Sequence, residues 1–243
     1  MTTTATATPA GPRRRPSTWP IPLALVALSL VPVVAGALRV TDVATSSTFM
    51  PEDAHHPSVP VALVVHIVSA VVYSLVGAFQ FSAGLRRRRP RWHRAAGRVL
   101  VPMGLAVAGS ALWMTLGYPR EVHTGPLLFW SRLVFGTGMI LCLVLGLRAI
   151  LRKDVPMHRA WMIRAYALGL GAGTQVVTIG LGQAVFGTST AVTDTVTAVG
   201  WAINLTLAEL VIRMPRANSR APSPLSAQHV NRTTTRRTLD DYR

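Results

Sequence analysis

Four histidines occupy two pairs of matching positions, and they are the residues whose type and spacing could do chemistry. His93 and His158 each follow a basic turn and directly precede an arginine and an alanine, and we call them the inner pair. His66 and His123, the outer pair, lie upstream of the first and the second turn. Two neutral imidazoles from different helices can bind the iron of a b-type haem from opposite faces. The inner pair is therefore a candidate haem iron site, and the outer pair a candidate second one.

Cations near each pair could neutralise the carboxylates of a bound haem. The inner pair has four arginines close by in the sequence, at Arg94, Arg98, Arg159 and Arg164. Of these we expect Arg98 and Arg164 to bind the cofactor. The outer pair has Arg120 and Arg132.

The two basic turns belong to a repeated pattern. Each copy leaves an apolar segment through Gly-Leu-Arg, at residues 84–86 and 146–148, and turns in a basic loop that contains a proline. Each re-enters an apolar segment through His-Arg-Ala, at residues 93–95 and 158–160. Two copies of one pattern predict two helical hairpins of similar construction. We call residues 86–96 the first basic turn.

The composition places the chain in the membrane class. Hydrophobic residues make up 50% of the chain and the mean hydropathy is +0.37, which is too apolar for an ordinary soluble domain. The single cysteine, Cys142, lies in an apolar segment and excludes an intrachain disulfide. The sequence shows no Ser-His-Asp or Cys-His catalytic set, no phosphate-binding loop and no pair of catalytic carboxylates.

Six apolar segments could cross a bilayer, at residues 19–38, 61–85, 99–118, 127–147, 161–186 and 196–212. We expect an all-α integral membrane protein with six transmembrane helices, in which spans two to five form a four-helix core of two repeated hairpins. This domain covers residues 19–212, between a disordered tail at 1–18 and a disordered basic tail at 213–243. The first segment could instead be a signal peptide, because Val34-Ala35-Gly36-Ala37 resembles a cleavage site.

The net charge of +16 would suggest nucleic acid on a soluble chain, but the positions of the charges exclude that interpretation. Of the 25 lysines and arginines, all but three lie in the two tails and in residues 86–98 and 148–164, which contain the two basic turns. The exceptions are Arg39, Arg120 and Arg132. This asymmetry predicts a cell-membrane protein with both termini cytoplasmic. The basic cytoplasmic loops could contact anionic lipid headgroups. The oligomeric state stays open.

Polar residues inside the spans should face other helices rather than lipid. The second span carries a stripe at helical spacing: His66, Ser69, Tyr73, Gly77, Gln80 and Gly84. The fifth carries another: Arg164, Gly171, Gln175, Thr178 and Gly182. Glu209 near the inner end of the sixth span predicts an ion pair with Arg98 or Arg164. Arg132 needs a partner, water or a bound anion, or it extends to the outer surface.

The histidines also have interpretations without haem. His93 and His158 could anchor the turns at headgroup phosphates, which the neighbouring Trp92 and Trp161 would support. The pair His55-His56 could bind a divalent metal, but no third well-spaced ligand accompanies it.

Two resemblances attach to these residues. A bacterial predicted-membrane-protein family, known only as a domain of unknown function, has a signature that this chain resembles at His66 through Gly77, residues 79–81, Leu85-Arg86, His93-Arg94 and Gly97-Arg98. The elements at 158–164 and 201–209 fit it too, and the resemblance covers about residues 60–212. More distantly, the order of the histidines is similar to that in the dihaem ascorbate-reducible b-type cytochromes. That resemblance implies pairing of His66 with His123 and of His93 with His158, with electron transfer between two haems.

We therefore expect a b-type haem redox protein that carries electrons across or within the membrane. The alternative is a non-redox membrane protein, either a small-solute transporter or a structural, lipid-contacting module. The polar stripes and Arg132 motivate that alternative, because a substrate path would need them as well.

Overall fold

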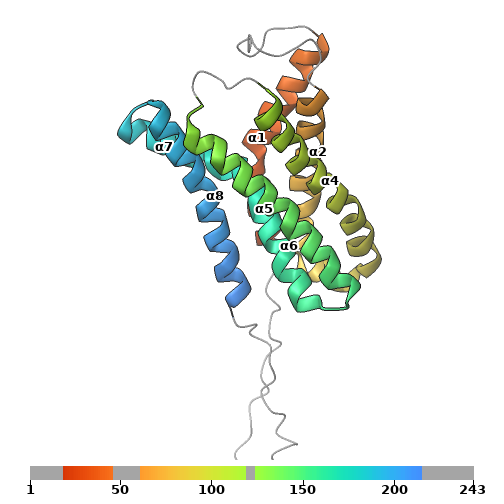
Figure 1. The fold of residues 1–243 in the computed structure, drawn as a ribbon. Helices are drawn as coiled ribbons and strands as arrows, with labels where there is room; N and C mark the ends of the chain where they lie inside the picture. The colour runs from red at the N-terminus through yellow and green to blue at the C-terminus, as the bar shows by residue number, and fades with distance from the viewer. Residues whose placement is uncertain (1–18, 46–60, 119–123, 215–243) are drawn as a thin grey trace, which may run out of the picture. The chain divides into compact units, whose positions relative to one another are not determined.

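The computed structural model describes residues 19–45, 61–118 and 124–214, and over these residues the chain is helical apart from short connections (Figure 1). The chain divides into a helical unit, Met1–Ile212, and a second unit, Arg213–Arg243. The helices of the described residues are α1 (Pro20–Thr45), α2 (Val61–Gln80), α3 (Ala83–Arg88), α4 (Pro90–Gly117), α5 (Pro126–Leu151), α6 (Val155–Gly169), α7 (Gly171–Phe186) and α8 (Thr190–Arg213). The predicted tail at 1–18, His55-His56 and His123 lie outside the described residues, as does the tail at 213–243 except for Arg213 and Met214. Arg213 is the last residue of α8, so the helix of the sixth span extends one residue into the predicted tail.

The fold class predicted from the sequence is confirmed. Five of the described helices are long and apolar enough to cross a membrane, and α6 with α7 supplies a sixth span if the bent pair is counted as one. α2 packs against α4, and α5 packs against α6, so that the two predicted hairpins lie side by side through the contact of α4 with α5 (Figure 1).

The first basic turn is helical, although the sequence suggested a loop. α2 ends at Gln80, and Ser82 caps the short α3 by accepting a hydrogen bond from Leu85 N at 3.3 Å. One residue, Arg89, separates α3 from α4, which begins at Pro90. Proline is well suited to the first helical turn, because it has no N–H to leave unpaired there. His93 is therefore the fourth residue of α4 rather than part of a loop.

The turn between α5 and α6 is tighter. Lys153 adopts a positive φ of 62° there. Asp154 then caps α6, because its Oδ1 accepts a hydrogen bond from Met157 N at 2.9 Å. Pro156 lies in the first turn of α6 as Pro90 does in α4, so His158 is the fourth residue of its helix as well. The repeat seen in the sequence thus extends to the local structure.

Two buried tyrosines join the hairpins. Tyr73 of α2 packs against Gly104 of α4 and Gly169 of α6, where a Cβ atom would approach its ring to 2.7 Å. Tyr166 of α6 packs over Gly77 of α2, and its hydroxyl donates a hydrogen bond to a carbonyl of α2 at 2.6 Å. Glycine at these positions lets the helices approach closely, as expected where lipid supplies no hydrophobic drive to association.

The predicted fifth span, 161–186, is not one straight helix. α6 and α7 meet at Leu170 and are bent by 46°. Asn204 of α8 bridges the bend, because its Nδ2 donates to Ala167 O at 3.0 Å and its Oδ1 accepts from Thr174 Oγ1 at 2.7 Å. A carbonyl released by a bend needs a partner in apolar surroundings. Asn204 supplies that partner and stabilises the break.

α8 packs against α7 through polar and small residues. Gln183 Nε2 donates to Thr193 Oγ1 at 3.1 Å, and Gln175 Nε2 donates to Thr197 O at 3.1 Å. A Cβ atom on Gly200 would lie 2.8 Å from the Gln175 side chain. The polar stripe predicted on the fifth span therefore faces α8. α1 contacts α2 and α7.

Candidate functional site

His158 is held in a defined orientation by the end of α5. Its Nδ1 lies 2.8 Å from Gly146 O. A carbonyl can only accept a hydrogen bond, so Nδ1 carries a proton, and in a neutral imidazole Nε2 then has the lone pair. A histidine that binds a metal commonly has this arrangement, in which a carbonyl fixes one nitrogen and leaves the other as the ligand.

His93 has a buried ring nitrogen without a partner. Its Nδ1 is shielded from solvent and forms no hydrogen bond with any residue that the structure describes. An unpaired buried nitrogen costs free energy, about 1–3 kcal/mol, so a native structure keeps one where it serves another purpose. On the same face of α4, one turn further along, a Cβ atom on Gly97 would meet no atom within 4 Å. Gly97 therefore faces open space one turn from His93.

The two histidines of the inner pair lie at the same level. Tyr73 contacts both Gly104 of α4 and Gly169 of α6. Each glycine follows the histidine of its helix by the same eleven positions, from 93 to 104 and from 158 to 169. Both helices lead away from a basic turn at the same end of the bundle, so both histidines are about three turns from Tyr73. They are also close enough for His158 to act electrostatically on His93.

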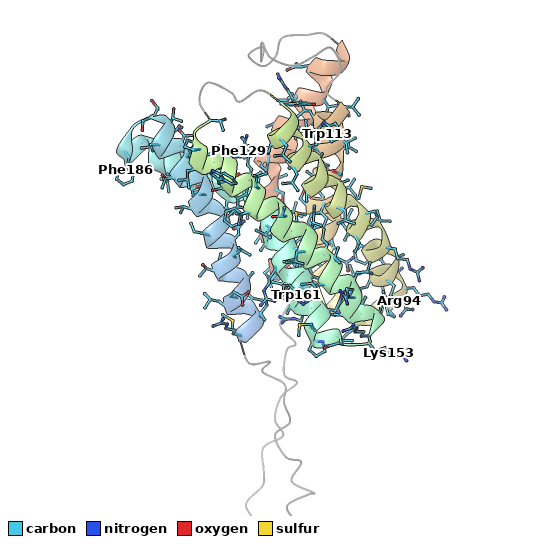
Figure 2. The ribbon with its side chains drawn as sticks, viewed as in Figure 1. Arg94, Trp113, Phe129, Lys153, Trp161 and Phe186 are labelled. Carbon is cyan, nitrogen blue, oxygen red and sulfur yellow. The ribbon has the colours of Figure 1, made fainter. Side chains whose placement is uncertain are left out.

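Arginines surround this end of the helices. Arg86 and Arg94 both act electrostatically on His93. Figure 2 shows Arg94, Lys153 and Trp161 at the same end of the bundle, with Trp113 and Phe129 at the opposite end. The prediction that both basic turns lie on one side agrees with this arrangement. Arg86 was not among the cofactor-binding residues predicted from the sequence. It precedes His93 by seven residues, and the short connection between α3 and α4 brings the two close together.

The side chain of Arg164 forms an ion pair with Glu209. Its Nε donates to Glu209 Oε1 at 2.5 Å and its Nη2 donates to Glu209 Oε2 at 3.1 Å, while its guanidinium lies 4.7 Å from the centre of the Trp161 ring. Glu209 thus pairs with Arg164, one of the two partners expected. The same bonds occupy the donors with which Arg164 was expected to bind the cofactor. The other predicted arginine, Arg98, is exposed.

Gln80 adds a second unpaired group near the inner pair. Its Nε2 is buried and forms no hydrogen bond with the described residues. Gln80 lies two turns beyond Tyr73 on the same face of α2, and α2 runs antiparallel to α4. This register places Gln80 about one turn from the level of His93.

The outer pair is only partly described. His66 Nδ1 lies 3.0 Å from Val107 O and 3.1 Å from Ser110 Oγ, both on α4. Donation to the carbonyl again leaves Nε2 with its lone pair. His123 lies outside the described residues, so its pairing with His66 stays a prediction. Arg132 is half-buried and has no hydrogen bond or ion pair with a described residue.

The structural role of Asp194 was not predicted from the sequence. Its carboxylate is buried, accepts hydrogen bonds from Gly125 N at 3.2 Å and Leu128 N at 3.0 Å, and so caps α5 from the start of α8. The available signal was indirect: Gly125 precedes Pro126 without a side chain that could cap the helix. The N-terminus of a helix favours a negative charge, which explains a buried carboxylate at this position.

Across the described residues no three His, Cys, Asp or Glu side chains converge as ligands for a metal ion. The inner pair consists of two histidines, and a bis-histidine haem centre takes two ligands from protein. Residues 63–212 match the profile of the family described as Predicted membrane protein (DUF2306). No curated protein and no solved structure matches the chain.

Proposed function

We propose that this chain, which belongs to the DUF2306 family of predicted membrane proteins, holds a b-type haem between His93 and His158 and carries electrons across or within the membrane. The family and the helices establish an integral membrane protein with several spans. The observation that carries the redox assignment is the inner pair itself. Two imidazoles occupy the same level on neighbouring helices, one with its Nδ1 fixed by a carbonyl and one with a buried nitrogen that has no partner.

The residues around the inner pair fit the group. His93 and His158 would hold the haem iron, and Gly97, one turn further along α4, faces open space. A haem bound by two imidazoles supplies a one-electron couple. Arg86 and Arg94 would neutralise its carboxylates, because both act on His93 and neither has a carboxylate partner among the described residues. This replaces the role expected of Arg164, whose donors are bound to Glu209.

The visible spectrum of the purified protein tests the proposal. The full chain is made in cells supplied with a haem precursor, extracted in detergent, and measured for haem content per chain and for its oxidised and reduced spectra. We expect a sharp spectrum of low-spin iron that shifts on reduction. His93→Ala and His158→Ala should each abolish it, whereas Arg91→Ala, an exposed change in the same turn of α4, should preserve it. A colourless preparation that is monodisperse and helical would overturn the proposal.

A non-redox role is the second candidate, and a groove between α2 and α4 is the observation that favours it. The groove has a volume of about 500 Å³ and is lined mainly by apolar residues of both helices, among them Val65, Gly109 and Trp113. Ser110, which bonds to His66, supplies a polar group to its wall. Such a groove suits a lipid-contacting module or the entry to a small-solute path. If haem is absent from folded protein, this groove and Arg132 become the first places to mutate.

A further inference from the structure

Seven arginines form an unneutralised surface at one end of the bundle. They are Arg86, Arg87, Arg88, Arg89, Arg91, Arg94 and Arg98, which we call the arginine surface, and all of them are exposed. No aspartate or glutamate occurs in the sequence between Asp53 and Glu121. Neither α3 nor α4 can therefore offer these arginines a carboxylate from its own residues.

The nearby acids on other helices are committed elsewhere. Asp154 accepts a hydrogen bond from Met157 N as the cap of α6. Glu209 binds Arg164 through both carboxylate oxygens. None of the seven arginines forms an ion pair or a hydrogen bond through its side chain with a described residue. The surface thus carries positive charge that the described part of the protein does not balance.

α3 presents this charge from a fixed element. Ser82 is buried and caps the helix, and the first residues, Ala83 to Leu85, are half-buried against the bundle while the arginines that follow are exposed. Contacts of α3 with α2 and α4 hold it in place. Like charges at this density destabilise a short helix. A bound anion would remove that repulsion, and several guanidinium groups held together can bind a phosphate through paired hydrogen bonds.

We propose that the arginine surface binds the phosphate headgroups of anionic phospholipids. The surface lies at the ends of α2 and α4, two helices long and apolar enough to span the bilayer, so the headgroup layer is the polyanion nearest to it. The half-buried Trp92 lies within the surface, and tryptophan favours that layer. Clusters of four to eight arginines or lysines beside a span are typical of anionic-lipid binding, and each contributes about 1 kcal/mol near a charged membrane.

The second basic turn supplies a matched comparison within the same chain. This turn, residues 148–159, carries Arg148, Arg152, Lys153 and Arg159, and Asp154 directly follows Lys153. This turn has no counterpart of α3 and reverses direction through the positive φ of Lys153. If charge count alone decided lipid binding, the two turns would behave alike. The proposal states that the first turn binds anionic headgroups more tightly, because its arginines are denser and lack an acidic neighbour.

The test compares two triple variants of the full chain in neutral detergent. Retention of added phosphatidylglycerol or phosphatidylcholine is measured by native mass spectrometry at low and at high salt. The wild type should retain phosphatidylglycerol preferentially, and less of it at high salt. R86Q/R87Q/R88Q should lower that retention about tenfold or more, whereas R148Q/R152Q/K153Q, which removes as many charges, should lower it by about twofold at most.

A third variant, R86K/R87K/R88K, keeps the charge and guards against a folding defect, and it should retain much of the preference. Equal losses in the two glutamine variants would overturn the proposal, as would equal retention of the two lipids by the wild type. A short labelled duplex DNA that binds through the same arginines, without any preference between the lipids, would assign the surface to nucleic acid instead. The proposed function assigns Arg86 and Arg94 to the haem carboxylates, so all variants are prepared without haem, and the lipid result then does not depend on the proposed redox function.

Discussion

Arg164 on α6 and Glu209 on α8 join the two helices through two parallel hydrogen bonds, from Nε to Oε1 at 2.5 Å and from Nη2 to Oε2 at 3.1 Å. The Trp161 ring covers the guanidinium, 4.7 Å away. The two side chains are 24% and 33% exposed, so solvent screens the pair only in part. This contact ties α8 to the four-helix core near the inner pair.

Removing the charge of Glu209 should therefore loosen α8. Glu209→Gln should lower the apparent melting temperature in detergent by about 2–4 °C, which corresponds to roughly 1 kcal/mol after allowance for the partial exposure of the pair. Arg98→Gln, at an exposed arginine, should leave it unchanged. In a double-mutant cycle, the variant with both Arg164→Gln and Glu209→Gln should lose less stability than the sum of the losses in the two single variants. Additive effects would show that the two side chains are not coupled.

Two glycines of α4 give the sharpest packing test. A Cβ atom on Gly104 would lie 2.7 Å from the Tyr73 ring and 2.9 Å from Leu143, whereas one on Gly109 would meet nothing within 4 Å. Gly104→Ala should destabilise the protein by about 1–3 kcal/mol through overpacking. Gly109→Ala should be neutral or slightly stabilising, because alanine favours a helix. Thermal unfolding of the two variants should therefore differ in sign or by several degrees, and equal melting temperatures would contradict the packing of Tyr73.

Much of the core could be predicted because helical spacing identifies a face. The stripes on the second and fifth spans were predicted to face other helices. Tyr73 and Gly77 do so, and Gln175 does so against α8. Glu209 could be assigned to an ion pair because a charge at that depth needs a partner. Whether Glu209 pairs with Arg164 or with Arg98 depends on how each helix is rotated about its axis, and the sequence of an apolar helix does not determine that rotation.

Other features had no local signal. The bend at Leu170 could not be separated from close helix packing, because the flanking glycines suit both and the residue that stabilises it, Asn204, comes from another helix. The cap that Asp194 supplies to α5 is likewise a contact between distant segments. Hydropathy also set the start of the third span at residue 99, since the arginines before it are polar, although α4 begins at Pro90.

Asp194 offers a third test, because it is a buried carboxylate whose bonds are all to backbone donors of α5. Asp194→Ala should cost about 1–3 kcal/mol, through the loss of two hydrogen bonds and the exposure of two unpaired N–H groups to apolar surroundings. Asp194→Asn keeps an oxygen that can accept one of them and should cost less. Melting curves in detergent would compare the two, and equal losses would indicate that the cap itself contributes little.

The orientation predicted from the charges can be tested by labelling single cysteines in a Cys142→Ala background. Cysteines at Arg87 and Lys153 should react with a membrane-impermeant thiol reagent only after the cytoplasmic face is opened. A cysteine at Ser189, in the connection between α7 and α8, should react in intact cells. Labelling of Arg87→Cys in intact cells would reverse the orientation and place both basic turns outside.

The two histidines of the inner pair should differ in what they contribute to stability, although both are proposed to bind the same iron. Nδ1 of His158 bonds to Gly146 O, so in haem-free protein His158→Leu should cost about 1 kcal/mol through the loss of that hydrogen bond. The buried nitrogen of His93 has no partner among the described residues, so His93→Leu removes an unpaired polar group. It should leave the melting temperature unchanged or raise it.

This contrast separates function from structure. A residue kept for its lone pair at the expense of stability fits a ligand, because function often retains groups that folding alone would discard. Both leucine variants should abolish the haem spectrum, while only His158→Leu should melt earlier than the wild type when both are prepared without haem. If His93→Leu destabilises the haem-free protein as much as His158→Leu does, the His93 imidazole has a structural partner. The inner pair would then anchor the first turns of α4 and α6 rather than bind iron.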